Sequence, residues 1–502
     1  MNPFVLADQL RETLLDYLRT TFHLADSQFE QQLFDFLDSP EGMFQGPFVD
    51  VRLPFRKALP GYSIPLEIKP PFLPHAHQVR AFERLFSSRG HQPQHTLVVT
   101  GTGSGKTECF LYPILDHCYR HRHQPGIKAI LLYPMNALAS DQARRLAGIL
   151  HEDPRLRDVV TAGLYVGGKG DRKVADATHL VDDRSVLRES PPHILLTNYK
   201  MLDFLMLRPD DRKLWRHNAH DTLRYLVLDE LHTYDGAQGS DVACLIRRLK
   251  ARLGTSAGTL CAVGTSATVG AGASQNNKLI EFAKDVFGEF FTTDSVVSED
   301  RQELDEVIPF TQDPGESLPP LQTWPLSNSA EEYLRSAEEM WFGRSGHAPL
   351  ELGKLLEQHW FTRKLLMSLA GRLPTLPELA IQLARFHPEF AQLEPPSQTL
   401  LLQTFLTLIS AARREVEGQT QPFLTCQTQF WVRELRHLTY HLGLSQFSWS
   451  EGRTVEPEPL FPPVCCRDCG GHFLLTIQRE ADPQLFTELS RIGQAFVERR
   501  PT

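Results

Sequence analysis

Short apolar runs alternate with amphipathic segments between about residues 73 and 272. Each apolar run has the length and the β-branched or aromatic content of a buried strand. Helices are expected to start near His77, Thr107, Leu138 and Asp241. Strands that alternate with helices predict an α/β fold with a parallel sheet covered on both faces, and chemistry gathers at the carboxyl ends of such strands. The predicted strands are "TLVVT", "KAILLYP", "AGLYVG", "HILLTN", "YLVLD" and "LCAVGTSAT".

The pattern changes on both sides of this region. Residues 1–70 indicate helices followed by an extended, proline-punctuated stretch, and residues 273–330 are acidic and weakly periodic, as expected of a linker. Residues 331–420 have a helical pattern that fits either a winged-helix-like unit or a plain helical bundle. Residues 421–502 form a C-terminal region with clustered cysteines. We therefore expect five parts, of which residues 71–272 are the α/β domain.

Composition is that of an ordinary globular protein. The 502 residues are 41% hydrophobic and 23% charged, and the chain is long enough for several domains. The net charge of −9 does not favour nucleic-acid binding, but a local basic groove can still bind phosphates on an acidic protein. No run reaches about 18 consecutive apolar residues, and the amino-terminal segment is acidic and amphipathic rather than a signal peptide. We expect a cytoplasmic protein with no membrane partner.

The stretch "TGTGSGKT", residues 100–107, joins a predicted strand to a predicted helix. A glycine-rich turn before a helix directs backbone N–H groups and the positive end of the helix dipole at one point, which favours phosphate binding. We expect Lys106 to reach the β- and γ-phosphates of ATP and Thr107 to hold Mg²⁺. Thr100 stands where the general P-loop pattern has glycine. The other residues expected around the phosphates are Thr102, Gly103, Ser104 and Gly105.

The predicted strand "YLVLD" ends in an acidic pair, Asp229 and Glu230. An aspartate at a strand end beside the phosphate loop can hold Mg²⁺. The neighbouring glutamate can then orient and deprotonate the attacking water. A strand that ends in two acids is weak evidence by itself, but after a P-loop in one α/β pattern it predicts an ATP hydrolysis site. The expected catalytic residues are Glu230, Lys106 and Asp229.

A third segment, Ser266-Ala267-Thr268, closes another predicted strand, although small hydroxyl residues are also common in turns. In this order, "TGTGSGKT", "DELH" and "SAT" resemble motifs I, II and III of superfamily 2 helicases of the DEAD/DEAH-box type, whose ATP-binding domain is RecA-like. The phrases "LLYPMNALASDQARRL" and "PPHILLTNYKMLDFLMLRP" further resemble the large bacterial helicases that carry a DUF1998 region. That group includes the YprA-like helicases and those of the Druantia and DISARM phage-defence systems.

The resemblance implies roles for residues outside the two ATP motifs. Gln78 matches the glutamine that recognises adenine in many such enzymes, and Ser266 and Thr268 match the motif that couples hydrolysis to movement. Leu231 stands where the family usually has alanine. Two further loops match those that hold the phosphate backbone of one nucleic-acid strand without reading its sequence. Their residues are Pro134, Asn136, Thr197 and Asn198.

Enzymes of this type use a second RecA-like domain, whose arginines reach the γ-phosphate and contribute roughly 10³–10⁵ in rate. No such motif is recognisable in residues 273–502. We therefore expect the N-terminal, ATP-binding half of an ATP-dependent DNA helicase or translocase, which depends on a second RecA-like domain or chain. RNA in place of DNA stays open. The alternative is a non-enzymatic, ATP-gated nucleic-acid-binding subunit, as in a phage-defence complex.

Eight cysteines are too few for a disulfide framework in a chain of this length. Three of them lie in "PPVCCRDCGG", where Cys466 and Cys469 have the spacing of one zinc-knuckle turn. A structural Zn²⁺ site needs four ligands, usually from two such turns, and Cys426 is the one distant candidate. Three interpretations of this cluster are open, namely zinc binding by Cys466 and Cys469, free buried cysteines, and redox chemistry.

Overall fold

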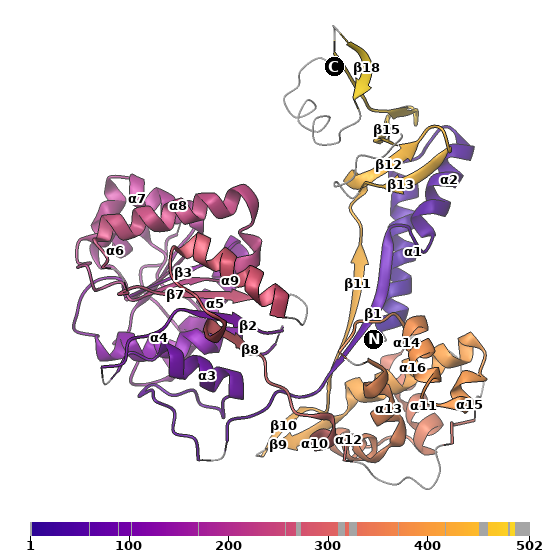
Figure 1. The fold of residues 1–502 in the computed structure, drawn as a ribbon, viewed down its shortest axis with the longest axis horizontal. Coiled ribbons are helices and arrows are strands. Elements are labelled where there is room, and N and C mark those ends of the chain that lie inside the picture. The colour runs from indigo at the N-terminus through magenta and orange to yellow at the C-terminus, as the bar shows by residue number, and fades with distance from the viewer. Residues whose placement is uncertain are drawn as a thin grey trace. The chain divides into compact units, whose positions relative to one another are not determined.

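The computed structural model divides the chain into two compact units, shown in Figure 1. Unit 1 combines Met1–Pro54 with Gln302–Thr502, and unit 2 is the continuous stretch Phe55–Arg301. Unit 2 is thus inserted into the sequence of unit 1, a grouping that the sequence pattern did not predict. The structure describes residues 3–59, 61–88, 90–101, 103–168, 170–256, 258–267, 273–309, 317–320, 329–369, 371–416, 418–450, 460–479 and 482–486.

Unit 2 is built on a seven-stranded sheet in which all neighbouring strands are parallel. The strand order is β4-β5-β3-β6-β7-β2-β8. The six predicted strands are all confirmed, whereas β8 lies in the stretch that we expected to be a linker. The strands are β2 (Thr96–Val99), β3 (Ala129–Leu132), β4 (Ala162–Tyr165), β5 (Ile194–Thr197), β6 (Tyr225–Leu228), β7 (Cys261–Ser266) and β8 (Val296–Ser298).

Helices cover both faces of this sheet. Successive strand residues point to opposite faces, so Ile130 packs in one core with α7, α8 and α9 while Leu131 packs in the other with α3, α4 and α5. The predicted starts hold for α3, α4 and α5, but α8 begins at Gly236 rather than near Asp241, because glycines in its first turn hide the helical pattern. The helices are α3 (Ala76–Leu85), α4 (Lys106–Arg120), α5 (Asn136–Glu152), α6 (Arg184–Glu189), α7 (Tyr199–Leu207), α8 (Gly236–Leu253) and α9 (Ala273–Phe287).

Unit 1 contains a helical core and a long antiparallel strand pair. The strand β1 (Phe44–Arg52) pairs with β11 (Thr425–Val432), which joins residues from opposite ends of the chain. Val49 and Val51 of β1 contribute to the apolar core of the helices. Residues 331–420 are mainly helical, as predicted, and end in a hairpin. These elements are α10 (Leu304–Val307), α11 (Ala330–Phe342), α12 (Pro349–Gln358), α13 (Trp360–Leu369), α14 (Leu376–Ala384), α15 (Pro388–Ala391), α16 (Pro395–Ala411), β9 (Arg413–Val416) and β10 (Gln419–Pro422).

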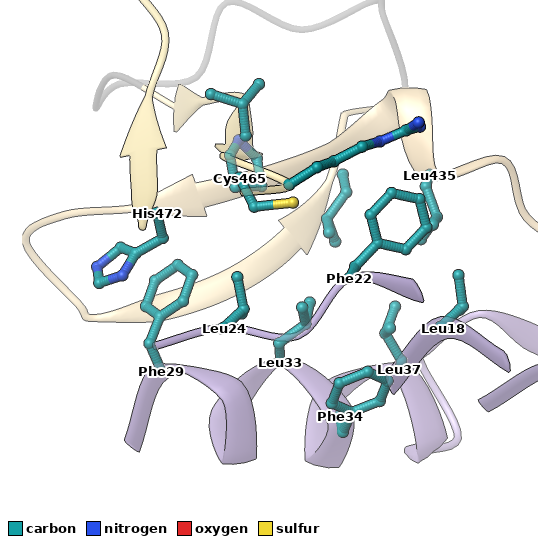
Figure 2. A pocket seen from close by; sticks show the side chains of 14 residues that line it. Leu18, Phe22, Leu24, Phe29, Leu33, Phe34, Leu37, Leu435, Cys465 and His472 are labelled. Atoms are coloured by element: carbon teal, nitrogen blue, oxygen red, sulfur yellow. The ribbon is translucent and has the colours of Figure 1, made fainter. Parts of the chain in front are cut away.

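The amino-terminal helices α1 (Pro3–Thr21) and α2 (Ser27–Asp38) pack against small strands from the C-terminal region. An apolar pocket of about 360 Å³ lies between them and is lined by side chains such as Phe22, Phe29, Leu435 and Cys465 (Figure 2). Among the helices that the structure describes, none is long and apolar enough to cross a lipid bilayer. The strands are β12 (Leu438–His441), β13 (Gln446–Trp449), β14 (Leu460–Phe461), β15 (Pro463–Cys465), β16 (His472–Leu474), β17 (Ile477–Arg479) and β18 (Asp482–Phe486).

Candidate active site

The glycine-rich loop lies where β2 ends and α4 begins. The helix starts at Lys106, so the N–H groups of its first turn have no partner within the helix and face the carboxyl edge of the sheet. Gly103 and Gly105 have φ angles of 78° and 75°, a left-handed conformation that favours glycine. A Cβ built on Gly103 would meet no described atom within 4 Å. The space beside Gly103 is therefore open, whereas a Cβ on Gly105 would lie 2.4 Å from the Gln78 amide nitrogen.

A hydrogen bond between two hydroxyl groups links residues on either side of the loop. The Thr100 and Ser104 hydroxyls are 2.7 Å apart and hydrogen-bonded, so threonine supplies a cross-link at the position where the general pattern has glycine. Thr107 lies half-buried in the first turn of α4, as expected for a residue whose hydroxyl would reach a bound ion. Thr102 falls outside the described residues.

Helix α3 supports the loop from one side. The ring Nε2 of His77 is 2.9 Å from the Ser104 carbonyl, and burial lowers the pKa of this histidine. The amide of Gln78 donates to the Gly105 carbonyl at 3.2 Å, and its oxygen accepts from the His75 N–H at 2.8 Å. Gln78 has 2% of its surface exposed, and its side chain is hydrogen-bonded to backbone groups in this structure. Its recognition of adenine stays a prediction.

The acidic pair at the end of β6 reaches the loop. The Lys106 ammonium is 3.2 Å from Oε1 of Glu230, which joins the two predicted ATP motifs in one ion pair. Glu230 adopts a left-handed backbone with φ of 51°, a conformation that costs energy for a non-glycine residue. Asp229 is buried beside it. Lys106, Asp229 and Glu230, which the sequence singled out, are therefore brought together.

Thr265, a residue that the sequence reasoning missed, holds this acidic pair. Its hydroxyl donates to Oδ1 of Asp229 at 2.5 Å and accepts from the N–H of Glu230 at 3.0 Å. The parallel register of β6 and β7 sets Leu228 beside Gly264, so the next residue of each strand also meets. A prediction that β6 and β7 are neighbouring strands would have identified Thr265.

The electrostatics of the acidic pair suit a cation. Burial raises the pKa of Asp229, and the nearby Glu230 carboxylate raises it further, while the Thr265 hydroxyl and the Lys106 ammonium lower it. Oε2 of Glu230 is buried, accepts no hydrogen bond among the described residues and lies 3.5 Å from Nδ1 of His232. Buried charge of this kind is costly unless a ligand compensates it. The residues present thus fit Mg²⁺ and a nucleotide.

The coupling segment is partly described. Ser266 ends β7, and its hydroxyl is 3.2 Å from Nδ1 of His232, the last residue of "DELH". The third and second motifs are therefore in direct contact. Thr268 lies outside the described residues.

The predicted nucleic-acid residues meet at the carboxyl ends of β3 and β5. The amide nitrogen of Asn198 donates to Oδ1 of Asn136 at 2.6 Å, which links the two loops. Pro134 lies two residues after the end of β3, and Met135 between it and Asn136 has 63% of its surface exposed. Thr197 is fully buried: its hydroxyl donates to the Tyr165 carbonyl, and its own carbonyl accepts from the Tyr133 N–H at 3.0 Å, so it lies beneath this surface rather than on it. Its contact with a nucleic acid stays a prediction.

The cysteine cluster divides into two parts. Backbone N–H groups of Cys469 and Asp468 lower the pKa of the Cys466 thiol, which lies in a tight turn. Cys465 and His472 instead face the apolar pocket, where the His472 ring stacks on Phe29 with centroids 4.1 Å apart (Figure 2). Within the described ranges, no group of three or more histidines, cysteines or acids is placed to hold a metal ion.

The family model for DEAD/DEAH box helicases matches residues 75–275, the range that contains the loop, the acidic pair and the two asparagines. The Druantia protein DruE of Escherichia coli (strain UMEA 4076-1) is 27% identical over 372 residues, which cover 52% of this chain and 20% of DruE. The ATP-dependent helicase YprA of Bacillus subtilis is 34% identical over 176 residues, which cover 35% of this chain and 20% of YprA. The chain thus spans about a fifth of the length of these relatives.

Among solved structures, the DUF1998 helicase MrfA bound to DNA is similar to this chain at 23% identity and a TM-score of 0.37. The similarity covers 54% of this chain and 34% of MrfA.

Proposed function

Because residues 75–275 form a DEAD/DEAH box helicase domain, we propose that this chain binds ATP with Mg²⁺ at the carboxyl edge of its sheet and hydrolyses it. The observation that carries the proposal is the 3.2 Å ion pair between Lys106 and Glu230, which joins the phosphate loop to the acidic pair. In the nucleotide complex, Lys106 would exchange Glu230 for the β- and γ-phosphates. Mg²⁺ supplies neutralisation of the charge that develops on the phosphoryl oxygens.

Each residue of the site has a distinct role in this proposal. Glu230 orients the attacking water and takes its proton, and its buried Oε2, which accepts no hydrogen bond among the described residues, is the atom available for it. Asp229 and Thr107 hold the ion, with Thr265 keeping the Asp229 carboxylate in place. Gln78 is proposed to contact adenine. The backbone of the loop surrounds the phosphates through Thr102, Gly103, Ser104 and Gly105.

We further propose that one strand of DNA crosses the carboxyl ends of β3 and β5. The hydrogen bond between Asn136 and Asn198 supports this, because it arranges two loops as one polar surface beside the ATP site. Pro134 completes that surface, and Thr197 is buried directly beneath it. Contacts of this kind fit phosphate and sugar rather than base edges, so binding would be independent of sequence.

Coupling between the two ligands would run through the third motif. Ser266 touches His232 beside the water-activating glutamate, and Thr268 is its proposed partner in this role. Only one parallel sheet is present in the part of the chain that the structure describes. The arginines that complete hydrolysis would therefore come from a second RecA-like domain or chain, and turnover by this chain alone would be slow.

Steady-state ATP turnover by the full chain, with and without single-stranded DNA at low salt, tests the proposal. We expect Mg²⁺-dependent nucleotide binding with slow turnover. DNA-stimulated turnover would show that arginines are supplied, for example by a dimer, and absence of nucleotide binding would contradict the proposal. A chain whose DNA affinity responds to ATP but that never hydrolyses it would instead be an ATP-gated binding subunit. Competition with single-stranded RNA of equal length distinguishes the two nucleic acids.

Zinc is a separate proposal. Cys466 and Cys469 could supply two of the four ligands of a structural site, since the turn already favours the Cys466 thiolate. About one equivalent of zinc in the purified full chain would support it, and zinc that is absent after purification in zinc-containing buffer would contradict it.

A further inference from the structure

Glu299 lies directly beside the entry to the phosphate loop, although it is remote from the loop in sequence. It follows β8, which pairs in parallel with β2 so that Ser298 lies beside Val99. The next residues of both strands therefore run alongside each other at the carboxyl edge. The sequence gives no motif at this position, because β8 is short and lies in the acidic stretch 273–330.

The Glu299 carboxylate binds the loop backbone. Its Oε2 accepts the N–H of Gly101 at 2.9 Å. Arg301 holds the same carboxylate through Nε to Oε1 at 2.9 Å and Nη2 to Oε2 at 3.3 Å. The Arg301 guanidinium in turn lies 4.0 Å from the ring centre of Phe55.

Arg301 offsets the negative charge of Glu299 next to the loop. A lone carboxylate this close to a phosphate-binding loop would repel the ligand. A two-point arginine pair neutralises the charge and fixes the carboxylate orientation. Glu299 can thus serve as a hydrogen-bond acceptor at the loop without opposing the nucleotide.

The support under Glu299 is ordered backbone. Phe55 and Arg301 form an antiparallel bridge, and the N–H of Arg56 donates to the Asp300 carbonyl at 2.8 Å. The Arg56 carbonyl also accepts from the N–H of Ala76, the first residue of α3. The carboxylate is therefore held by paired segments that are joined to the same helix that supports the loop from its other side.

We propose that Glu299 is a positioning residue for the phosphate loop, which holds the Gly101 amide in place and so sets the affinity for nucleoside di- and triphosphates. This inference rests on the proposed function, because it concerns how the proposed ATP loop is held. The contact is made at the loop entry and not at the γ-phosphate, so it should strengthen the binding of ADP and ATP by the same factor.

The test compares two substitutions of similar size in the full chain. Glu299→Met removes the acceptor, whereas Glu299→Gln keeps an oxygen that can accept from Gly101. The matched control is Glu289→Met. Glu289 is as buried as Glu299, with side-chain exposures of 17% and 18%, and pairs with Lys250 at 2.6 Å near the opposite end of β2.

Affinities for the fluorescent nucleotides mant-ATP and mant-ADP, with Mg²⁺, are the readout. We expect Glu299→Met to weaken both about tenfold, as for loss of one hydrogen bond to a charged group, and Glu299→Gln to weaken both less than about threefold. Glu289→Met should change neither more than about twofold. Wild-type affinity in Glu299→Met, or an equal loss in Glu289→Met, would overturn the proposal.

Two additions keep the outcome decisive. If Glu299→Met does not fold, Arg301→Gln is tested in its place. This variant keeps the Glu299 carboxylate but removes the arginine that orients it, so the affinities for both nucleotides are expected to fall about threefold. Wild-type affinity in Arg301→Gln also overturns the proposal. Lys106→Ala separates the two levels of inference. Nucleotide binding that Lys106→Ala does not change would refute the ATP site itself. Binding that is lost in Lys106→Ala but unchanged in Glu299→Met would refute only the positioning role.

Discussion

Charged groups at the amino edge of the parallel sheet differ from the acidic pair at the carboxyl end of β6. At the amino edge, the fully buried Lys128 donates to backbone carbonyls, and Glu289 is paired with Lys250. At the carboxyl end of β6, burial raises the pKa of Asp229, and Oε2 of Glu230 accepts no hydrogen bond among the described residues. A charged group whose hydrogen bonds are all made internally contributes to stability, whereas a buried carboxylate oxygen that accepts no hydrogen bond is available to a ligand.

This contrast separates stability from function along the same strands. Substitutions at the amino edge should lower the free energy of unfolding and leave nucleotide binding unchanged. Substitutions at the carboxyl end of β6 and in the phosphate loop should impair nucleotide binding or turnover, whether or not they also lower stability.

The largest effect is expected at the two lysines. Lys106→Ala removes the ammonium proposed to hold the phosphates, so mant-ATP affinity should fall about 100-fold or more. Lys128→Met, at the amino edge, should keep wild-type affinity. Fluorescence titration measures both, and a comparable loss in Lys128→Met would break the contrast between the edges.

Glu230→Gln should uncouple binding from chemistry. The amide cannot take the proton of the attacking water, so ATP turnover should fall about 100-fold or more, while mant-ATP affinity stays within about threefold. Turnover is measured in the presence of single-stranded DNA. Normal hydrolysis by this variant would show that another group is the general base.

Thr265→Val should have an intermediate effect. Loss of the hydroxyl removes the hydrogen bonds to the Asp229 carboxylate and to the backbone N–H of Glu230. Turnover should therefore fall about tenfold, and the free energy of unfolding should fall by about 1 kcal/mol. Thr96→Val is the matched control, because that hydroxyl is also buried and donates to the Gln94 carbonyl at the amino edge. It should lose similar stability in urea unfolding but keep its turnover.

Asn136→Ala should have the smallest effect. Removing the acceptor of the Asn198 amide loosens the proposed DNA surface, so affinity for single-stranded DNA should fall about threefold and mant-ATP affinity should not change. Asn218→Ala removes an asparagine that binds the backbone of Ile127 at the amino edge. Equal DNA affinities of the two variants, measured by fluorescence anisotropy, would remove the support for this surface.

Local pattern was sufficient for the parts of the site that lie within single segments. The loop "TGTGSGKT" and the acidic pair are each carried by one strand and the turn that follows it, so their residue types and spacing identify them. The six strands were likewise predicted because all are buried on both faces and read as short apolar runs. Lys106, Asp229 and Glu230 accordingly lie where the pattern implied.

Residues that act across strands could not be read in the same way. Thr265 and Glu299 depend on which strands are neighbours and in what register, and β8 is too short to give an apolar run. Cys465 and Cys466 are adjacent in sequence, yet only Cys465 faces the apolar pocket, because it ends a strand and Cys466 begins a turn. Such differences come from tertiary packing and not from local preference.

The pairing of β1 with β11 has a consequence for synthesis on the ribosome. Arg52 is translated roughly 370 residues before its partner Thr425, and the whole of unit 2 is made in between. At about 5–20 residues per second, β1 waits roughly 20–75 s for its partner strand. During that interval its backbone edge has no partner from this pair, and unpaired edges are prone to aggregation. Unit 2 can therefore be complete before the partner strand of β1 has been made.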